Sequence, residues 1–263
     1  MGSMLLAVNV GNTNTSLGVF RGTELQHHWR LSTSPRRTAD EMAVVFEALL
    51  EQADLSFTSQ ITGVVISSVV PTSTTALRDM VHRYFNFPPV VVEPGTKTGI
   101  SILTDNPREV GADRVVNALA AFDRYGGPCI VIDFGTATTY DVVSEKGEFL
   151  GGVIAPGMQV SNAALSSSTA RLPQVELHAP KTVIAKNTVE SIQSALIYGT
   201  AAEADGIIDR IREELGVDAT VVATGGLAPL IVPYCQRVDR HDEWLTLEGL
   251  RLVFDRNVGS GDD

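Results

Sequence analysis

The stretch NVGNTNTSLGVF, residues 9–20, joins one apolar run to another through a small, uncharged turn. Residues 5–10 and 15–20 on either side of the bend have the character of short β-strands. A related stretch, DFGTATTYDVVS, returns at residues 133–144. Aligning the two superposes four pairs of residues: Asn9 with Asp133, Gly11 with Gly135, Asn12 with Thr136 and Thr15 with Thr139. The repeat predicts a fold built from two copies of one unit.

The same order of elements is predicted around each hairpin. The first copy continues with a strand at 24–31, an amphipathic helix at 38–53 that Thr38 and Glu41 begin with a capping box, a strand at 63–70, a helix at 73–86 and a strand at 89–93. The second has a helix at 112–125, strands at 129–134, 137–144, 148–156 and 219–226, a long helix over 187–215 and a closing helix. We predict an α/β fold with two duplicated domains, residues 4–114 and 115–257, each with three antiparallel strands followed by alternating helices and strands.

The composition is that of a well-packed chain with an acidic surface. The 263 residues are 44% hydrophobic and 19% charged, and the formal net charge is -11. An acidic surface opposes non-specific binding to nucleic acid or to an anionic membrane, so we expect neither partner. No apolar run reaches the roughly 20 residues of a membrane span. The cysteines, Cys129 and Cys235, lack CxxC spacing, which predicts buried free thiols in a cytoplasmic protein. Residues 1–3 resemble a vector remnant and are left out of the prediction.

Neutral turns that contain glycine are suited to bind phosphate. Glycine lets backbone N–H groups approach an anion, hydroxyl groups add donors, and no carboxylate repels the charge. One such turn alone would be read as an ordinary polar bend, whereas two that face each other across a cleft could hold a polyphosphate. The motif ATGGL at 223–227 ends a predicted strand in two glycines, which suits close backbone contact with a flat ring or a ribose.

Eight motifs make the chain resemble a known family. They are VGNTNTSLGVF (10–20), SSVVP (67–71), EPGTKTGI (93–100), DNPREVGADRVVNALAA (105–121), DFGTATT (133–139), GEFLGGVIAPG (147–157), KNTVESIQSALIYG (186–199) and ATGGL (223–227). From residue 4 to about residue 254 the sequence resembles the type III pantothenate kinases of the acetate/sugar kinase–Hsp70–actin superfamily. The resemblance implies two ribonuclease H-like domains with the active site in the cleft between them, a homodimer, and phosphorylation of pantothenate by ATP, the first step of coenzyme A biosynthesis.

The resemblance also assigns the substrate residues. Asp113, in the motif Gly111-Ala112-Asp113-Arg114, is expected to be the general base that takes the proton of the pantothenate hydroxyl, although an acid at a helix start is common without any catalytic role. Arg114 could bind a substrate carboxylate or phosphate, or pair with Asp113. Thr188 resembles a pantothenate contact, with the cap of the long helix as its ordinary reading, and Gly99 is placed along the substrate cleft.

The nucleotide and metal residues follow in the same way. The resemblance implies ATP bound with Mg²⁺, and Asp133 as the ligand of a monovalent cation, K⁺ or NH₄⁺, where an Asp that caps a turn is the alternative. The implied ATP contacts are Asn9, Val10, Gly11, Asn12, Thr13, Asn14, Thr15, Ser16 and Thr136 at the phosphates, and Gly225 and Gly226 at the adenosine.

The sequence departs from the family pattern at its first site residue. The family begins Asp-x-Gly-Asn-Thr, and here Asn9 replaces the aspartate, which removes a charge expected to place Mg²⁺. Asn9 is either a natural variant, an engineered substitution, or the mark of a catalytically weakened protein that acts by binding or regulation. For the function, a kinase of the same superfamily that acts on another small hydroxyl compound, such as a sugar or acetate, is a third reading beside the pantothenate kinase and the binding protein. For the dimer, an apolar stripe could form the interface or belong to the core: Ile192, Leu196, Ile197 and Ile207.

Overall fold

The computed structural model describes residues 4–258. Contacts divide the described chain into two compact units. Unit 1 comprises residues 4–100, 105–120 and 245–258, and unit 2 comprises residues 101–104 and 121–244. The predicted boundary after residue 114 falls within helix α3 (Ala112–Tyr125), whose residues are shared by the two units, and it stays a prediction.

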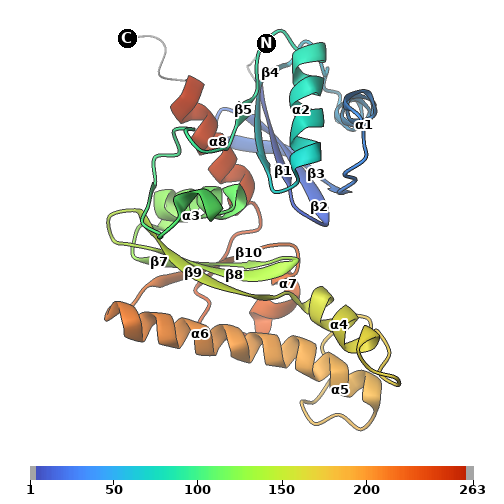
Figure 1. The fold of residues 1–263 in the computed structure, drawn as a ribbon, viewed down its shortest axis with the longest axis vertical. Coiled ribbons are helices and arrows are strands. Elements are labelled where there is room, and N and C mark those ends of the chain that lie inside the picture. The colour runs from blue at the N-terminus through green and yellow to red at the C-terminus, as the bar shows by residue number, and fades with distance from the viewer. Residues whose placement is uncertain (1–3, 259–263) are drawn as a thin grey trace. The chain divides into compact units, whose positions relative to one another are not determined.

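Unit 1 contains the first five-stranded sheet (Figure 1). Its strands are β1 (Met4–Val10), β2 (Asn14–Arg21), β3 (Glu24–Ser32), β4 (Ile61–Ser68) and β5 (Val90–Val91). Strands β1, β2 and β3 form antiparallel pairs, whereas β4 lies parallel to β1 and β5 parallel to β4. The spatial order is therefore β3-β2-β1-β4-β5.

Helices cover both faces of this sheet. On one face, α1 (Ala39–Glu51) and α2 (Pro71–Tyr84) pack against each other, and Leu6 and Val8 of β1 join the buried cluster that they cover. Because side chains alternate along a strand, the neighbouring residues of β1 face the other way, where α8 (Leu245–Val258) contacts β1 and β4. The predicted capping box of α1 is confirmed, since the Thr38 Oγ1 and Glu41 groups bond each other as expected.

Unit 2 repeats the topology of unit 1. Its strands are β6 (Ser101–Ile102), β7 (Cys129–Phe134), β8 (Ala137–Val143), β9 (Glu148–Pro156), β10 (Thr220–Thr224) and β11 (Arg240–His241). Strands β7, β8 and β9 are antiparallel, β10 is parallel to β7, and β11 is parallel to β10, so the order β9-β8-β7-β10-β11 matches that of unit 1. The short β6 adds to β9 at the edge. The predicted duplication is therefore present in the strand order.

The helices of unit 2 differ from the prediction at α4 and in the middle of the long helix. They are α4 (Met158–Ser167), which was not predicted, α5 (Thr188–Ser194), α6 (Thr200–Leu215) and the short α7 (Ala228–Ile231). The single helix expected over 187–215 is interrupted by a π-helical turn, Ala195–Gly199. Packing explains the interruption: Leu196 and Ile197 are buried in the unit 2 core, while the Tyr198 hydroxyl donates to the carbonyl of Pro180.

The aligned hairpins differ by one residue in their turns. Asn9 pairs with Ser16, seven residues on, whereas Asp133 pairs with Thr139, only six residues on. The proposed match of Thr15 with Thr139 is therefore shifted by one position. The reason is local, because the first turn closes through a Gly11 N–H bond to Asn14 and the second through a Gly135 N–H bond to Ala137.

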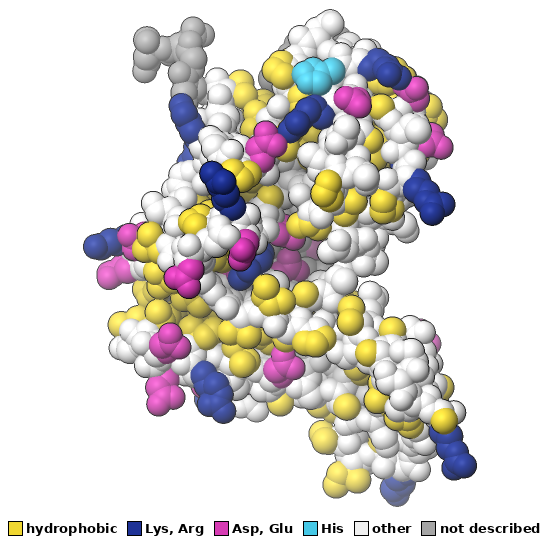
Figure 2. All heavy atoms as spheres, in the orientation of Figure 1, with side chains coloured by type: hydrophobic (Ala, Val, Ile, Leu, Met, Phe, Trp, Pro, Cys, Tyr) yellow, Lys and Arg dark blue, Asp and Glu magenta, His cyan; other side chains and the backbone are white. Residues whose placement is uncertain are grey.

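The surface carries both signs of charge. Figure 2 shows Lys and Arg side chains interspersed with Asp and Glu over the face in view. In the part of the chain that the structure describes, every helix is too short or too polar to cross a membrane. Residues 1–3, interpreted as a vector remnant, lie outside the described residues.

Candidate active site

Three polar side chains lie in a row where β1 meets its neighbours. Asn9 pairs with Ser16 of β2 on one side and with Ser67 of β4 on the other. The Oδ1 of Asn9 and the Oγ of Ser67 are buried without a hydrogen-bond partner among the described residues. A buried polar atom without a partner costs free energy that a bound ligand or water recovers. This row therefore fits a hydrated ion or a phosphate oxygen, and Ser67 adds to the predicted residues.

The signal for Ser67 was present in the sequence. Two adjacent serines end the otherwise apolar run of β4, which is unusual for a strand whose other inward side chains are hydrophobic. The Ser67 side chain is fully buried, so it was not placed there to face solvent. Polar groups at the carboxyl end of a central strand are typical of ligand sites in α/β sheets.

The turn after β1 presents backbone and small polar groups. A bond of 2.9 Å from the Gly11 N–H to the Asn14 carbonyl closes it, and Asn12, Thr13 and Asn14 are exposed. Val10 differs from these residues because its side chain is buried in the unit 1 core. Only the backbone of Val10 is available to a ligand.

Asp113 is the second residue of α3, and its carboxylate is largely removed from water. Burial raises the pKa of Asp113, while the hydrogen bond from the Arg114 N–H to Oδ1 (2.9 Å) and the positive charge of Arg114 act in the opposite direction. The net pKa lies above the usual value, because burial is the largest influence. A Cβ at position 111 would lie 2.6 Å from Asp113 Oδ1, so Gly111 leaves room for this carboxylate. Such a carboxylate is suited to accept a proton.

In unit 2, Asp133 and the glycine turn after β10 lie together. Asp133 pairs with Thr224, so the strand ends of β7 and β10 are adjacent. Gly225 follows with φ of +96°, and a Cβ there would overlap Asp133 Oδ1 and lie 2.6 Å from the Phe134 nitrogen. Glycine is therefore required by both the backbone conformation and the available space. Gly226, next along the chain, is exposed.

The β7–β8 turn is held by the start of α4. The Gly157 N–H donates to the Thr136 carbonyl at 3.1 Å, and a Cβ at position 157 would overlap the carbonyl oxygens of Gly135 and Thr136. Gly157 is also the N-cap of α4, so the positive end of this helix lies against the turn. Gly157 was not among the predicted site residues. Its place directly after the predicted strand at 148–156 was the only signal for it in the sequence.

Two further predicted substrate residues, Thr188 and Gly99, are described by their local structure. Thr188 is the first residue of α5 and is exposed, but the cap is Asn187, whose Oδ1 accepts from the Glu190 N–H at 2.9 Å. The reading of Thr188 as the N-cap was therefore wrong, and its hydroxyl is not used for capping. Gly99 has φ of +78° and packs closely against the side chain of Arg256 on α8.

Comparisons with known proteins give one consistent family. A family model described as type III pantothenate kinase matches residues 5–210. A type III pantothenate kinase from Acidothermus cellulolyticus is 54% identical over 256 residues, covering 97% of this chain and 99% of that protein. One from Exiguobacterium is 50% identical over 254 residues, with 97% and 99% covered.

Solved structures of low identity share the fold. A conserved putative Baf family transcriptional activator from Campylobacter jejuni has a TM-score of 0.55 at 19% identity, and the match covers 97% of this chain and 99% of that chain. A reductive activator for a corrinoid, iron-sulfur protein has a TM-score of 0.58 at 10% identity, with 98% and 61% covered. With the repeated strand order, these likenesses confirm the predicted α/β fold of duplicated, ribonuclease H-like units.

Proposed function

This chain belongs to the type III pantothenate kinase family, and we propose that it transfers the γ-phosphoryl group of ATP to the primary hydroxyl of pantothenate. The products are 4'-phosphopantothenate and ADP, and the reaction is the first step of coenzyme A biosynthesis, in the cytoplasm. The observation that carries the proposal is 54% identity over 97% of the chain with a protein of that name. The buried carboxylate at the start of α3 supports it.

Asp113 acts as the general base in this proposal. Its carboxylate accepts the hydroxyl proton as the pantothenate oxygen bonds to the γ-phosphorus, while the bond from that phosphorus to the bridging oxygen breaks and ADP leaves. Burial suits this role, because a carboxylate with a raised pKa holds the transferred proton better than an exposed aspartate does. Gly111, Ala112, Arg114, Thr188 and Gly99 are the proposed pantothenate contacts.

The ATP contacts are divided between the two repeats. Residues 9–16 bind phosphates through backbone N–H groups and hydroxyls, and Thr136 adds a contact from the β7–β8 turn, next to the positive end of α4. Gly225 and Gly226 lie beside the adenosine in this proposal. The cleft expected between the domains remains a prediction.

The residues present fit metal ions of two kinds. The unpartnered oxygens of Asn9 and Ser67 suit Mg²⁺ that is bound through water and the nucleotide, and Asp133 suits K⁺ or NH₄⁺. Bound Mg²⁺ would neutralise phosphate charge. In the described part of the chain no three or more His, Cys, Asp or Glu residues form a metal cluster.

The experiment is a turnover assay with and without pantothenate, and with K⁺ or NH₄⁺ replaced by Na⁺. We expect ATP consumption that requires pantothenate and a suitable monovalent cation. A panel of sugars and acetate tests the third reading, and turnover of one of them in place of pantothenate would overturn the assignment.

The second candidate function is a binding or regulatory role, which the substitution at Asn9 favours. Asn9→Asp beside the original chain separates the two. If residue 9 places Mg²⁺, the aspartate should raise kcat by roughly 10²- to 10³-fold, as for other preorganised electrostatic groups. Equal kcat values would mean that the metal is held elsewhere. If neither form turns over but both bind ATP, the binding role replaces the kinase.

For the proposed homodimer, the burial of the apolar stripe within unit 2 favours a contact at other side chains. Ile192, Leu196 and Ile197 are buried in the unit 2 core, and Ile207 packs against it. Other apolar side chains are exposed on and around α4 and α5: Val160, Leu165, Val183, Ile184 and Val189. Figure 2 shows hydrophobic side chains on the face in view in the region of these two helices. We propose that the dimer contact lies at these exposed side chains. Ile184→Lys should then be a monomer, and light scattering measures its molar mass.

A further inference from the structure

Thr33, just after β3, holds the β1–β2 turn at two points. Its N–H donates to the Thr13 carbonyl at 2.9 Å. Its Oγ1 donates to the Gly11 carbonyl at 2.8 Å and lies 3.0 Å from the Oγ1 of Thr15. Thr33 is 22 positions from Gly11 in the sequence, so only the fold brings them together.

The direction of these bonds follows from the number of protons. A threonine hydroxyl has one proton, and that of Thr33 is given to Gly11. The proton between the two hydroxyls must therefore come from Thr15. The result is a chain in which Thr15 donates to Thr33 and Thr33 donates to the Gly11 carbonyl. Hydrogen bonds linked in this way strengthen one another.

The chain fixes the orientation of a backbone amide. In a planar, trans peptide the carbonyl and the following N–H point in opposite directions. Because the Gly11 carbonyl is directed to Thr33, the N–H of Asn12 is directed away from it. Asn12 is exposed, and its N–H has no backbone acceptor in the part of the chain that the structure describes. An oriented, unused N–H is the donor that an anion requires.

The second repeat provides an internal comparison. There the Gly157 N–H donates to the Thr136 carbonyl, in the same position relative to the strands as the bond from Thr33 to Thr13. Glycine has no hydroxyl, so the second turn lacks the additional tether. The first turn is one residue longer, and a longer turn has more conformations to exclude. The hydroxyl of Thr33 therefore has a specific task in the first repeat.

We infer that Thr33 is a positioning residue, which holds residues 11–13 in the conformation that binds the ATP phosphates. This inference rests on the proposed role of residues 9–16 in ATP binding. Thr33 acts through the backbone of the turn and belongs to no motif by which the sequence was assigned. Loss of its hydroxyl should weaken ATP binding and leave pantothenate binding as it was.

The test is a series of variants measured by titration calorimetry with Mg²⁺-ATP, and by KM for each substrate. Thr33→Val keeps the shape and removes the hydroxyl, and it should raise the Kd and KM for ATP by about five- to tenfold, the value of one hydrogen bond. Thr33→Ser should restore them. The KM for pantothenate should stay constant throughout.

Thr38→Val is the matched control, since it removes a threonine hydroxyl that caps α1 in the same unit. It should lower the melting temperature without changing the Kd for ATP. If Thr33→Val loses stability but binds ATP as the original chain does, Thr33 is structural and the inference is wrong. If Thr33→Val does not fold, Thr33→Ala removes the same hydroxyl, and an unchanged Kd for ATP in that variant would equally overturn the inference. If the original chain binds no ATP, the proposed function is wrong as well. If the original chain phosphorylates pantothenate and Thr33→Val binds ATP equally well, only the inference about Thr33 is wrong.

Discussion

At the scale of single residues, Asp113 combines a favourable position with an unfavourable environment. It lies in the first turn of α3, where a negative charge is stabilised, but burial outweighs this and raises its pKa. The folded state therefore holds the proton more tightly than the unfolded state does. The contribution of Asp113 to stability is greatest below its ordinary pKa and falls as the pH rises through the raised one.

Asp113→Asn should consequently change activity and stability in opposite directions. At neutral pH the variant should lose roughly 10²- to 10⁴-fold in kcat, the usual effect of a general base, but it should unfold at an equal or higher urea concentration. In the original chain, kcat should decrease as the pH is lowered, and the midpoint of this decrease should lie above the ordinary pKa of aspartate. These are measured by pH–rate profiles and by urea titration. A variant that is both less stable at neutral pH and fully active would contradict the assignment.

Gly225 has a left-handed backbone and no room for a Cβ. Gly225→Ala would combine a left-handed backbone with overlap at Asp133 and Phe134, which should cost on the order of 3 kcal/mol or more. Gly216→Ala is the control, because Gly216 has φ of +68° but nothing within 4 Å of its added Cβ, and about 1 kcal/mol is expected. Chemical denaturation measures both. Equal costs would show that backbone strain alone, rather than crowding beside Asp133, requires glycine.

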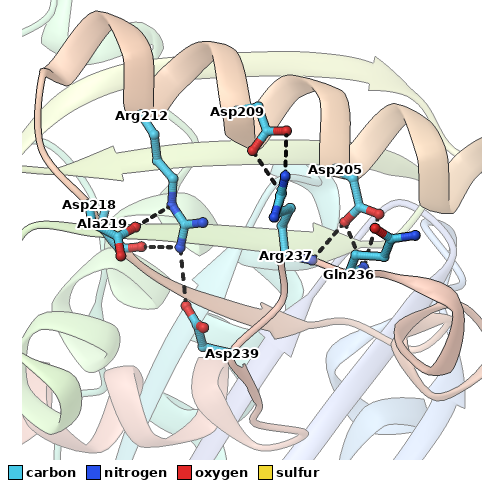
Figure 3. A network of polar contacts seen from close by, with 8 residues as sticks. All are labelled: Asp205, Asp209, Arg212, Asp218, Ala219, Gln236, Arg237 and Asp239. Atoms are coloured by element: carbon cyan, nitrogen blue, oxygen red, sulfur yellow. Dashed lines mark hydrogen bonds and ion pairs between the residues drawn. The ribbon is translucent and has the colours of Figure 1, made fainter.

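At the scale of elements, two arginines, Arg212 and Arg237, link α6 to neighbouring segments (Figure 3). Arg212 donates to the Ala219 carbonyl at 2.8 Å, and its Nε lies 2.8 Å from Asp218 in an ion pair without hydrogen-bond geometry. Arg237 pairs with Asp209 and is more exposed, with side-chain accessibility of 46% against 21% for Arg212. Exposed ion pairs contribute little, because water and salt screen them.

Arg212→Met should therefore destabilise the protein more than Arg237→Met. We expect about 1–3 kcal/mol for the first, which leaves the Ala219 carbonyl without this donor and Asp218 without its ion pair, and about 0–1 kcal/mol for the second. Urea titrations at low and at high salt measure both values. Equal losses, or a loss at Arg212 that disappears in high salt, would mean that burial does not distinguish the two sites.

At the scale of the whole molecule, the two units have separate hydrophobic cores. The unit 1 cluster includes Leu50 and the unit 2 cluster includes Ile208, both almost completely buried, and the clusters share no residue. A chain with two cores need not unfold in one step. Each core should therefore report on its own unit.

Leu50→Ala and Ile208→Ala should each cost about 2–5 kcal/mol, the range for large-to-small changes in a core. Hydrogen exchange followed by mass spectrometry should show lost protection mainly in β1, β4 and α1 for Leu50→Ala, and mainly in β7, β10 and α6 for Ile208→Ala. If either variant loosened both units equally, the molecule would behave as one cooperative body.

Much of the molecule was determined by local sequence. Short β-type runs bounded by turn residues predicted β1, β2, β3, β7, β8 and β9, and the capping box of α1 was identified from Thr38 and Glu41. These signals act between residues close in the chain. The π-helical turn at 195–199 was missed because packing rather than local propensity sets it. Helix α4 was missed because serine, asparagine and alanine leave it with few apolar side chains and a weak helical pattern.

The sequence by itself identified the repeat, the family and the residues at the ends of its strands, since glycine, aspartate and hydroxyl residues mark turns wherever they lie. Only the tertiary structure decided which of them are neighbours. Ser67 beside Asn9, Gly157 against Thr136 and Thr33 on the Gly11 carbonyl are pairs separated by many residues, and strand pairing brings them together. The burial that raises the pKa of Asp113 is likewise a property of the folded chain, because removal of water requires residues from distant segments.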